Sequence, residues 1–129
     1  MKLFVVRHGQ TSYNVENKVC GSTDADLNET GIMQAKAAAQ KFSDIHIDKV
    51  YSSPLRRALK TAEIIAAKVS INKEDIIIDK RLSEQDYGIY EGVDRKNEDF
   101  LRNKKNFAFR YPSGESMMQT ACRVYNLLD

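Results

Sequence analysis

The sequence contains little cysteine, and the two thiols that it has form no recognisable pattern. Cys20 and Cys122 are the only cysteines among 129 residues, and they match neither a metal-ligand nor a CxxC spacing. A disulfide framework or a zinc-stabilised fold is therefore not indicated. We expect both cysteines to be free, with Cys122 buried as a small hydrophobe in an amphipathic helix.

Long apolar runs and an excess of either charge are also absent. The longest apolar runs have about four or five residues, whereas a membrane-spanning helix needs roughly 18 to 20. Lys and Arg number 20 and Asp and Glu number 18, which gives no general attraction to nucleic acids or membranes. Met1-Lys2 leads directly into a predicted strand instead of a signal peptide. We therefore expect a cytoplasmic protein with no nucleic-acid or membrane partner.

Neither a metal site nor a nucleotide-binding loop is visible in the sequence. The two histidines, His8 and His46, are far apart, and the acidic residues form no ligand spacing. No glycine-rich loop of the P-loop or dinucleotide type occurs. We expect no metal and no cofactor, and we expect His46 to be a structural or surface residue. The length and the hydrophobic content of 42% fit one domain over residues 1–129.

Strand signals and helix signals alternate along the chain. Strands are predicted at 2–6, 50–51 and 76–78, the last as an apolar run buried on both faces. Helices are predicted over 29–43 after an Asn28 cap, from Ser53-Pro54 to about 69, partly within 94–111, and from a cap at Ser113 or Gly114 to near the chain's end. The alternation predicts parallel strands joined by right-handed crossovers, hence an α/β sheet. The last helix is expected to turn inward Met118, Ala121, Tyr125 and Leu128.

The first apolar run delivers a basic residue, an imidazole and a glycine to one loop. Arg7, His8 and Gly9 directly follow the predicted strand 2–6. Arginine offers a fixed fork of donors to a phosphate, a histidine nitrogen can attack phosphorus, and glycine lets the backbone approach an anion. Ligands of parallel α/β sheets bind beyond the carboxyl ends of the strands, so this loop and Ser53–Arg57 are expected to share one crevice. The chemistry indicated is phosphoryl transfer through a phosphohistidine.

Four further segments complete a family pattern in order along the chain. They are Asp24–Gly31 with Gln34-Ala35, Ser52–Ala58 with Thr61-Ala62, Leu82–Gly88 with Glu91-Gly92, and Pro112–Ser116. Together with Arg7-His8-Gly9, they make nearly the whole chain resemble the histidine phosphatase superfamily, the phosphoglycerate mutase-like proteins. The resemblance implies a three-layer fold, with a mostly parallel sheet and helices on both faces. Members also carry a second His-Gly on a late strand, which is absent up to Asp129, so the domain is expected to be incomplete at its C-terminus.

The resemblance also implies roles for individual residues. His8 is the expected nucleophile, and Arg7 and Arg57 are expected to grip the phosphoryl oxygens. Arg57 is chosen over Arg56 because the family's functional arginine directly precedes the alanine of this motif. Glu84 is the expected general acid. The expected substrate-binding residues are Thr11, Asn14, Gly21, Ser22, Gly114 and Glu115.

Within the family, the choice lies between a phosphatase and a mutase. Mutases that resemble glycolytic phosphoglycerate mutase carry a long insertion after the Tyr-Gly segment and usually a tryptophan where this chain has Tyr13. Here Gly114 follows Glu84 by only 30 residues, which favours a phosphomonoester hydrolase for a small phosphorylated metabolite. Two alternatives stay open: phosphoglycerate mutase-type phosphoryl transfer, and a truncated, catalytically impaired phosphate-binding protein. Uncovered strand edges predict a chain that is either a homo-oligomer or marginally stable.

Overall fold

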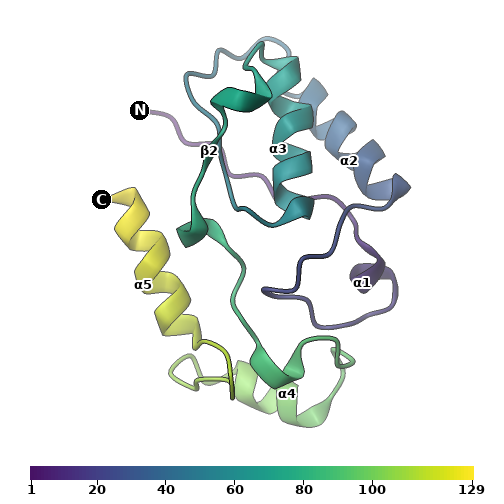
Figure 1. Cartoon of the computed structure of the whole chain (residues 1–129), viewed down its shortest axis with the longest axis vertical. Helices are drawn as coiled ribbons and strands as arrows, with labels where there is room; N and C mark the ends of the chain where they lie inside the picture. Colours follow the sequence, from purple (N-terminus) through teal and green to yellow (C-terminus); the bar gives the residue numbers. More distant parts are fainter.

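The computed structural model describes all 129 residues and has five helices and a small parallel sheet (Figure 1). The helices are α1 (Ser12–Val15), α2 (Glu29–Gln40), α3 (Arg56–Lys68), α4 (Glu98–Lys104) and α5 (Met117–Leu128). Short 3₁₀ turns form η1 (Lys73–Asp75), η2 (Lys80–Leu82) and η3 (Gly88–Tyr90). Strands β1 (Tyr51–Ser52) and β2 (Ile77–Ile78) pair in parallel. The predicted α/β class and parallel pairing are confirmed, and no helix is both long and apolar enough to span a membrane.

Helix α3 connects the two strands, and α2 packs along it (Figure 1). Helix α2 begins as the sequence predicts, because the Asn28 side chain accepts a hydrogen bond from the amide of Gly31. Helix α3 begins two residues after Pro54, where the Ser53 hydroxyl accepts from the Leu55 amide at 3.2 Å. The buried positions of the two helices are mostly small, which lets their axes approach closely. They include Ala35 and Ala39 in α2 and Ala62 and Ala66 in α3.

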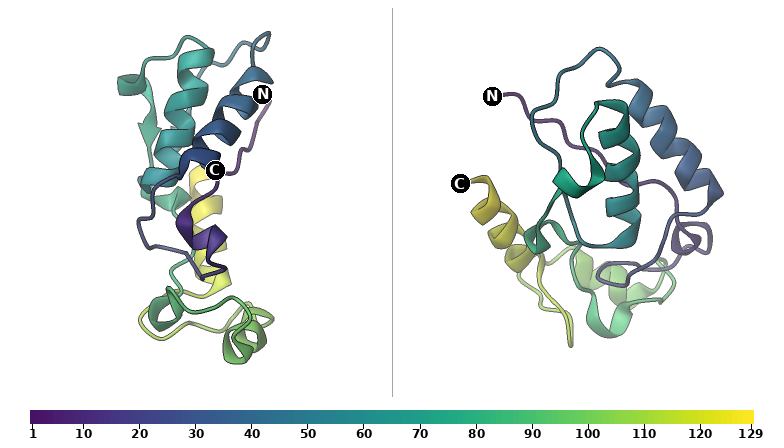
Figure 2. Two further views of the ribbon diagram at one scale, coloured as in Figure 1. Left: turned by 90° about the vertical axis from the view of Figure 1, so that its right-hand side faces the viewer. Right: turned by 45° about the horizontal axis from the view of Figure 1, so that its top comes forward.

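Six of the buried apolar residues form two separate clusters. One joins α3 to the sheet and contains Ala62, Ala66 and Ile76. The other contains Val19, Phe100 and Tyr111, with three more aromatic rings packed against it, those of Tyr87, Tyr90 and Phe109. Figure 2 shows that α4, which carries Phe100, lies at the end of an elongated molecule and away from α2 and α3. The molecule therefore has two centres of packing, and the segments between them carry the candidate site.

Two predicted strands differ from the structure. Residues 2–6 pair with no other strand, and Leu3 and Val5 are 65% and 87% exposed. Ile77 and Ile78 do form β2, but they are 38% and 53% exposed instead of buried on both faces. Both differences have one cause. An apolar run is buried only where neighbouring strands and helices cover it, and the sheet of this chain has two strands.

The prediction for the last helix was wrong in its start and in its inward face. Helix α5 is capped by Ser116 and not by Ser113 or Gly114: the Ser116 hydroxyl accepts from the Gln119 amide, and the Ser116 amide donates to the Gln119 side chain, which completes a capping box. Cys122 is exposed instead of buried. The reason is that α5 meets η2 through polar groups: Arg123 donates to the Arg81 carbonyl, and the Arg81 side chain donates to the Asn126 side chain. Three of the four residues predicted to face inward are exposed, namely Met118, Tyr125 and Leu128.

The exposed N-terminal segment leads to a prediction about association. We expect the 129-residue chain to show an average mass above 14.7 kDa in light scattering at rising concentration, because exposed apolar side chains and unpaired strand backbone favour pairing between copies. Val5→Lys should lower this mass, since a charge at an open strand edge opposes pairing. Met33→Lys is the matched control, at a residue of α2 that is 70% exposed. A monomer at every concentration would contradict the prediction.

Candidate active site

The first loop fixes the orientation and the tautomer of His8. The Nδ1 atom of His8 lies 2.7 Å from the carbonyl oxygen of Gly9. Because a carbonyl oxygen only accepts, Nδ1 carries the hydrogen, and in the neutral ring the lone pair is then on Nε2. Nε2 makes no hydrogen bond within the protein. This nitrogen is therefore the one available to attack an electrophile.

The surroundings of His8 favour the neutral imidazole. Burial is the main cause that lowers the pKa of His8 below its ordinary value, and the positive charges of Arg57 and Arg7 lower it further. The hydrogen bond to Gly9 and the carboxylate of Glu84 act in the opposite direction. Arg7, Arg57 and Glu84 thus all act electrostatically on His8.

Two glycines bring the loop of His8 into direct contact with α2. A Cβ atom at Gly9 would overlap the backbone carbonyl of Gly31, and a Cβ at Gly31 would overlap the carbonyl of Gln10. The Gly9 amide also donates to the Thr61 hydroxyl of α3 at 3.3 Å, and this hydroxyl donates to the carbonyl of Arg57 at 2.8 Å. The backbone beside His8 is therefore held by the first turn of α2 and by α3 together.

Arg57 and Arg56 have opposite environments although they are neighbours. The Arg57 side chain is buried, with 2% of the residue exposed, and it donates to the carbonyls of Thr23 and Gly21, both at 2.6 Å. No carboxylate pairs with it. Arg56 is exposed and pairs with Asp24. A buried guanidinium without a counter-ion is costly unless an anion completes its surroundings, so Arg57 is the arginine suited to phosphate.

The loop that Arg57 holds is anchored from its other side by Glu91. The Glu91 carboxylate accepts from the amides of Gly21 and Ser22, at 2.9 and 2.8 Å, and from the hydroxyl of Thr23 at 2.9 Å. A Cβ atom at Gly21 would overlap the carbonyl oxygen of Gln85. Gly21 therefore lies beside Arg57, and its amide and carbonyl are already engaged within the protein. Ser22 is exposed in the same loop.

Glu84 lies on the segment that crosses from η2 to η3. Its carboxylate is exposed and accepts from the amide of Gln85 at 2.9 Å. The negative charge of Glu84 contributes, after burial, to raising the pKa of Tyr87 to about 12, and it also acts on His8. The carboxylate thus acts electrostatically on the imidazole while it remains open to solvent, and a solvent-exposed carboxyl can exchange its proton with a bound ester.

Thr11 and Asn14 form the start of α1. Thr11 is fully buried, and its hydroxyl and amide both donate to the Asn14 side-chain oxygen, at 3.0 and 2.9 Å. The Asn14 amide donates to the Thr11 hydroxyl in return, which completes a capping box. The Thr11 side chain is thus used within the protein, whereas the side-chain NH₂ group of Asn14 is left without a partner there. Of the two predicted substrate residues, the geometry favours Asn14.

Gly114 and Glu115 lie against the segment that follows Glu84. Gly114 is buried, and a Cβ atom there would overlap the carbonyl oxygen of Asp86. The Glu115 carboxylate pairs with Arg123, at 3.0 Å from Nε and 2.9 Å from Nη2, and accepts from the Asp86 amide at 3.1 Å. The hydrogen bonds of Arg123 lower the pKa of Glu115. These contacts favour a structural role for Glu115 over the substrate-binding role expected from the sequence.

Three residues that shape the site had been assigned no role. Thr61 and Glu91 belong to recognised motifs, so their positions in those motifs were the available signal. Arg123 lies in no motif, and the sequence offered no signal for it. His46 is exposed beside Asp48, as expected for a surface histidine. No cluster of three or more His, Cys, Asp or Glu side chains is arranged to hold a metal ion.

Comparison with known proteins identifies the family. The model of the histidine phosphatase superfamily (branch 1) matches residues 3–129. The chain belongs to this superfamily. Its fold matches that of a mycobacterial glucosyl-3-phosphoglycerate phosphatase solved in complex with VO3, with a TM-score of 0.85 and 30% identity over 94% of this chain and 59% of the other. The native structure of that phosphatase gives a TM-score of 0.83, also at 30% identity.

Relatives of this histidine phosphatase family member include proteins named as mutases. The chain is 43% identical to phosphoglycerate mutase-like protein 4 of Arabidopsis thaliana over 71% of its own length and 40% of the relative's. It is 36% identical to the 2,3-bisphosphoglycerate-dependent phosphoglycerate mutase of Mesorhizobium japonicum over 95% of its own length and 64% of the relative's. The chain thus spans less than two thirds of the length of these relatives.

Proposed function

We propose that this protein hydrolyses a small phosphorylated metabolite through a phosphohistidine at His8. The observation that carries the proposal is the pairing of a buried, uncompensated guanidinium, that of Arg57, with an imidazole whose Nε2 is free and whose Nδ1 is tied to Gly9. One group offers charge for a phosphoryl anion and the other offers a nucleophile. The phosphatase neighbour solved with VO3 supports the same reading of the fold.

The proposed reaction has two balanced steps. In the first, His8 Nε2 forms a bond to phosphorus while the bond from phosphorus to the ester oxygen breaks, and Glu84 gives its proton to the leaving oxygen. In the second, Glu84 takes a proton from water as the water oxygen attacks phosphorus and the bond to His8 breaks. Inorganic phosphate leaves, and both residues return to their starting protonation states. Arg7 and Arg57 stabilise the charge on the phosphoryl oxygens in both steps.

The proposed chemistry needs no metal ion. The guanidiniums of Arg7 and Arg57 supply positive charge at the phosphoryl group, which is the role that a divalent cation has in many other phosphoryl-transfer sites. We expect turnover to be unchanged after dialysis against a chelator, as measured by phosphate release. A loss that returns on addition of a divalent cation would contradict this part of the proposal.

Labelling of the protein tests the proposed function directly. A short reaction with a radiolabelled phosphomonoester should leave phosphate on the protein that is labile in acid and stable in base, as a phosphohistidine is. Release of inorganic phosphate should follow. Tight binding of vanadate without labelling or release would instead support a catalytically impaired phosphate-binding protein. Absence of both binding and labelling would refute the proposed function.

The role of Glu84 predicts a dependence on the leaving group. Glu84→Gln should slow hydrolysis of an alkyl phosphate by about 10²-fold or more, because an alkoxide needs a proton as it leaves. Hydrolysis of p-nitrophenyl phosphate should fall much less, because its phenolate leaves without full protonation. The measurement is kcat/KM for the two esters. Glu74→Gln, at an exposed residue of η1, is the matched control, and equal slowing of both esters by Glu84→Gln would count against this role.

A mutase activity is the second candidate, because two relatives carry that name. In that reaction the second step transfers the phosphoryl group from His8 to a substrate hydroxyl in place of water. The two candidates differ in their product. Radiolabelled phosphoenzyme mixed with a phosphoglycerate in excess should release inorganic phosphate if the protein is a phosphatase. Recovery of the label in an organic bisphosphate would favour the mutase.

A further inference from the structure

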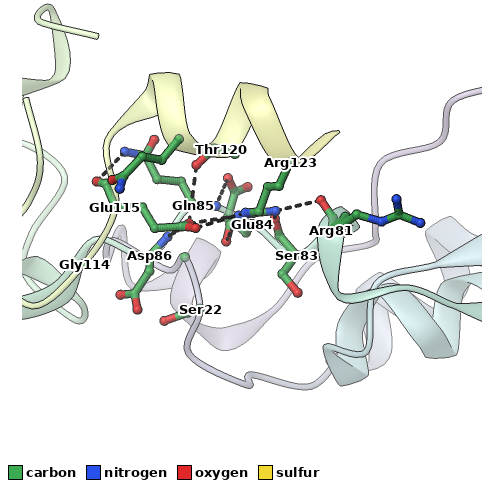
Figure 3. A network of polar contacts seen from close by, with 12 residues as sticks. Ser22, Arg81, Ser83, Glu84, Gln85, Asp86, Gly114, Glu115, Thr120 and Arg123 are labelled. Atoms are coloured by element: carbon green, nitrogen blue, oxygen red, sulfur yellow. Dashed lines mark hydrogen bonds and ion pairs between the residues drawn. The ribbon is translucent and has the colours of Figure 1, made fainter. Parts of the chain in front are cut away.

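Helix α5 reaches the candidate site through one arginine (Figure 3). The Arg123 side chain points from α5 toward the backbone before and at Glu84. Its Nη1 atom donates to the carbonyls of Arg81 and Ser83, at 2.7 and 2.6 Å, and its Nη2 atom donates to the carbonyl of Glu84 at 3.1 Å. Three carbonyls of one short segment are therefore held by a single planar group.

The Glu115 carboxylate completes this arrangement on the other side of Glu84. It pairs with Arg123 and accepts from the Asp86 amide, while the Glu115 amide donates to the Asp86 carbonyl at 2.8 Å. The carbonyl of Glu115 accepts from the side chain of Gln85, a residue that is 2% exposed, at 3.1 Å. The backbone is thus fixed both before and after Glu84, and Figure 3 shows the polar contacts that hold it.

Arg123 has no hydrogen left for a substrate. A guanidinium has five N–H donors, and the five hydrogen bonds of Arg123 go to Glu115 twice and to the carbonyls of Arg81, Ser83 and Glu84. The ion pair is also well shielded, with 20% and 28% of the two side chains exposed. An effect of Arg123 on the reaction must therefore act through the segment that it holds.

We propose that the ion pair of Arg123 and Glu115 positions Glu84 for proton transfer to the leaving group. The inference rests on the proposed phosphatase function. An exposed carboxylate can take many orientations, and their number grows if the backbone that carries it also moves. The ion pair holds the backbone of this segment and so limits the orientations of the Glu84 side chain. Arg123 and Glu115 are positioning residues: they touch no reacting atom, and they determine how often Glu84 meets the leaving oxygen.

The experiment compares two conservative variants with a matched control. Arg123→Lys keeps the charge beside Glu115 but loses the planar fork that reaches three carbonyls, and Glu115→Gln keeps the side-chain shape. Arg102→Lys is the control, because Arg102 forms an exposed pair with Asp99 on α4. For each protein we would measure kcat/KM for an alkyl phosphate and for p-nitrophenyl phosphate, the affinity for vanadate, and the melting temperature.

The expected result is a selective loss. Both variants should lower kcat/KM for the alkyl phosphate by about tenfold to a hundredfold, and should change the aryl ester and the vanadate affinity by less than about threefold. In a Glu84→Gln background, Arg123→Lys should cause no further selective loss, because the group that it positions is already gone. The Arg102→Lys control should behave as the unmodified protein in every measurement.

Other results overturn the inference in distinguishable ways. Equal losses for both esters, or a parallel loss of vanadate affinity, would make the ion pair a general structural feature. If Arg123→Lys melts below the assay temperature, the isosteric Glu115→Gln variant decides. If the unmodified protein neither binds vanadate nor hydrolyses either ester, the proposed function fails and this inference fails with it. Turnover by the unmodified protein, with an unselective loss in the variants, would overturn the inference alone.

Discussion

Replacing His8 with alanine is expected to abolish turnover and the acid-labile phosphoenzyme together. One nitrogen, Nε2, both attacks phosphorus and stores the phosphoryl group, so no part of the proposed cycle survives without it. The loss of a covalent nucleophile costs about 10³-fold or more in kcat. The measurements are phosphate release and the amount of label bound to the protein. The tautomer fixed by the Gly9 carbonyl at 2.7 Å makes Nε2 the expected site of labelling.

The second histidine of the chain supplies the control for this experiment. His46→Ala should leave labelling and turnover unchanged, because His46 is exposed and contacts Asp48 at 3.2 Å. Labelling that persists in His8→Ala would show that the nucleophile lies elsewhere. The pH dependence gives a further check. Because burial and the two arginines lower the pKa of His8, its protonation should reduce kcat/KM only below about pH 6.5, the ordinary histidine value.

Replacing Arg57 with alanine is expected to weaken vanadate and phosphate binding by about 1.5–3 kcal/mol, or roughly 10- to 150-fold in Kd. The guanidinium is buried with no carboxylate beside it, so an anion would supply its missing counter-charge. Calorimetric titration with vanadate measures the loss. The variant also frees the carbonyls of Gly21 and Thr23, so the melting temperature should be recorded in parallel.

The neighbouring arginine gives a stringent comparison. Arg56→Ala removes an exposed pair with Asp24, at 3.4 Å from Nε, and exposed pairs contribute little to stability or to binding elsewhere. We therefore expect anion affinity within about twofold of the unmodified protein. Equal losses for Arg56→Ala and Arg57→Ala would reverse the assignment of the phosphate-binding arginine.

The candidate catalytic residues could be selected from the sequence because they occupy fixed places in local motifs. Arg7 and His8 directly follow an apolar run, Arg57 lies in the first turn of a helix, and Glu84 precedes a Tyr-Gly pair, so each position needs only a short stretch of chain to be recognised. The residues that hold the segment around Glu84 could not be predicted in the same way. Arg123 donates to carbonyls about 40 residues away in the sequence. Because every residue has a backbone carbonyl, no sequence pattern indicates which carbonyls a distant arginine binds.

The fold shows the same division between local and distant causes. The Asn28 cap and the start of α3 near Pro54 depend on neighbouring residues; the sequence predicted the cap correctly and placed the start of α3 two residues too early. Burial of Ile77 and Ile78 depends on other strands of the sheet, and the sequence predicted it wrongly. Helix α5 repeats the lesson, because it meets η2 through polar side chains such as Arg123. An apolar period on a helix indicates which face is able to be buried, and tertiary contacts decide whether it is.

The loop of residues 21–23, which Arg57 and Glu91 hold from two sides, connects anion affinity at the candidate site with the stability of the aromatic cluster at the far end of the molecule. Glu91 holds Gly21 and Thr23 and also accepts from the Tyr87 amide at 3.2 Å, next to the aromatic cluster around Phe100. Because Tyr87 packs against that cluster, opening the cluster would free the Tyr87 amide from Glu91 and loosen the loop whose carbonyls orient Arg57. By thermodynamic reciprocity, an anion that binds at Arg57 would then raise the free energy needed to open the cluster. Substitutions deep in the aromatic cluster would therefore register as weaker anion binding at Arg57, although Arg57 forms no hydrogen bond with any residue of the cluster.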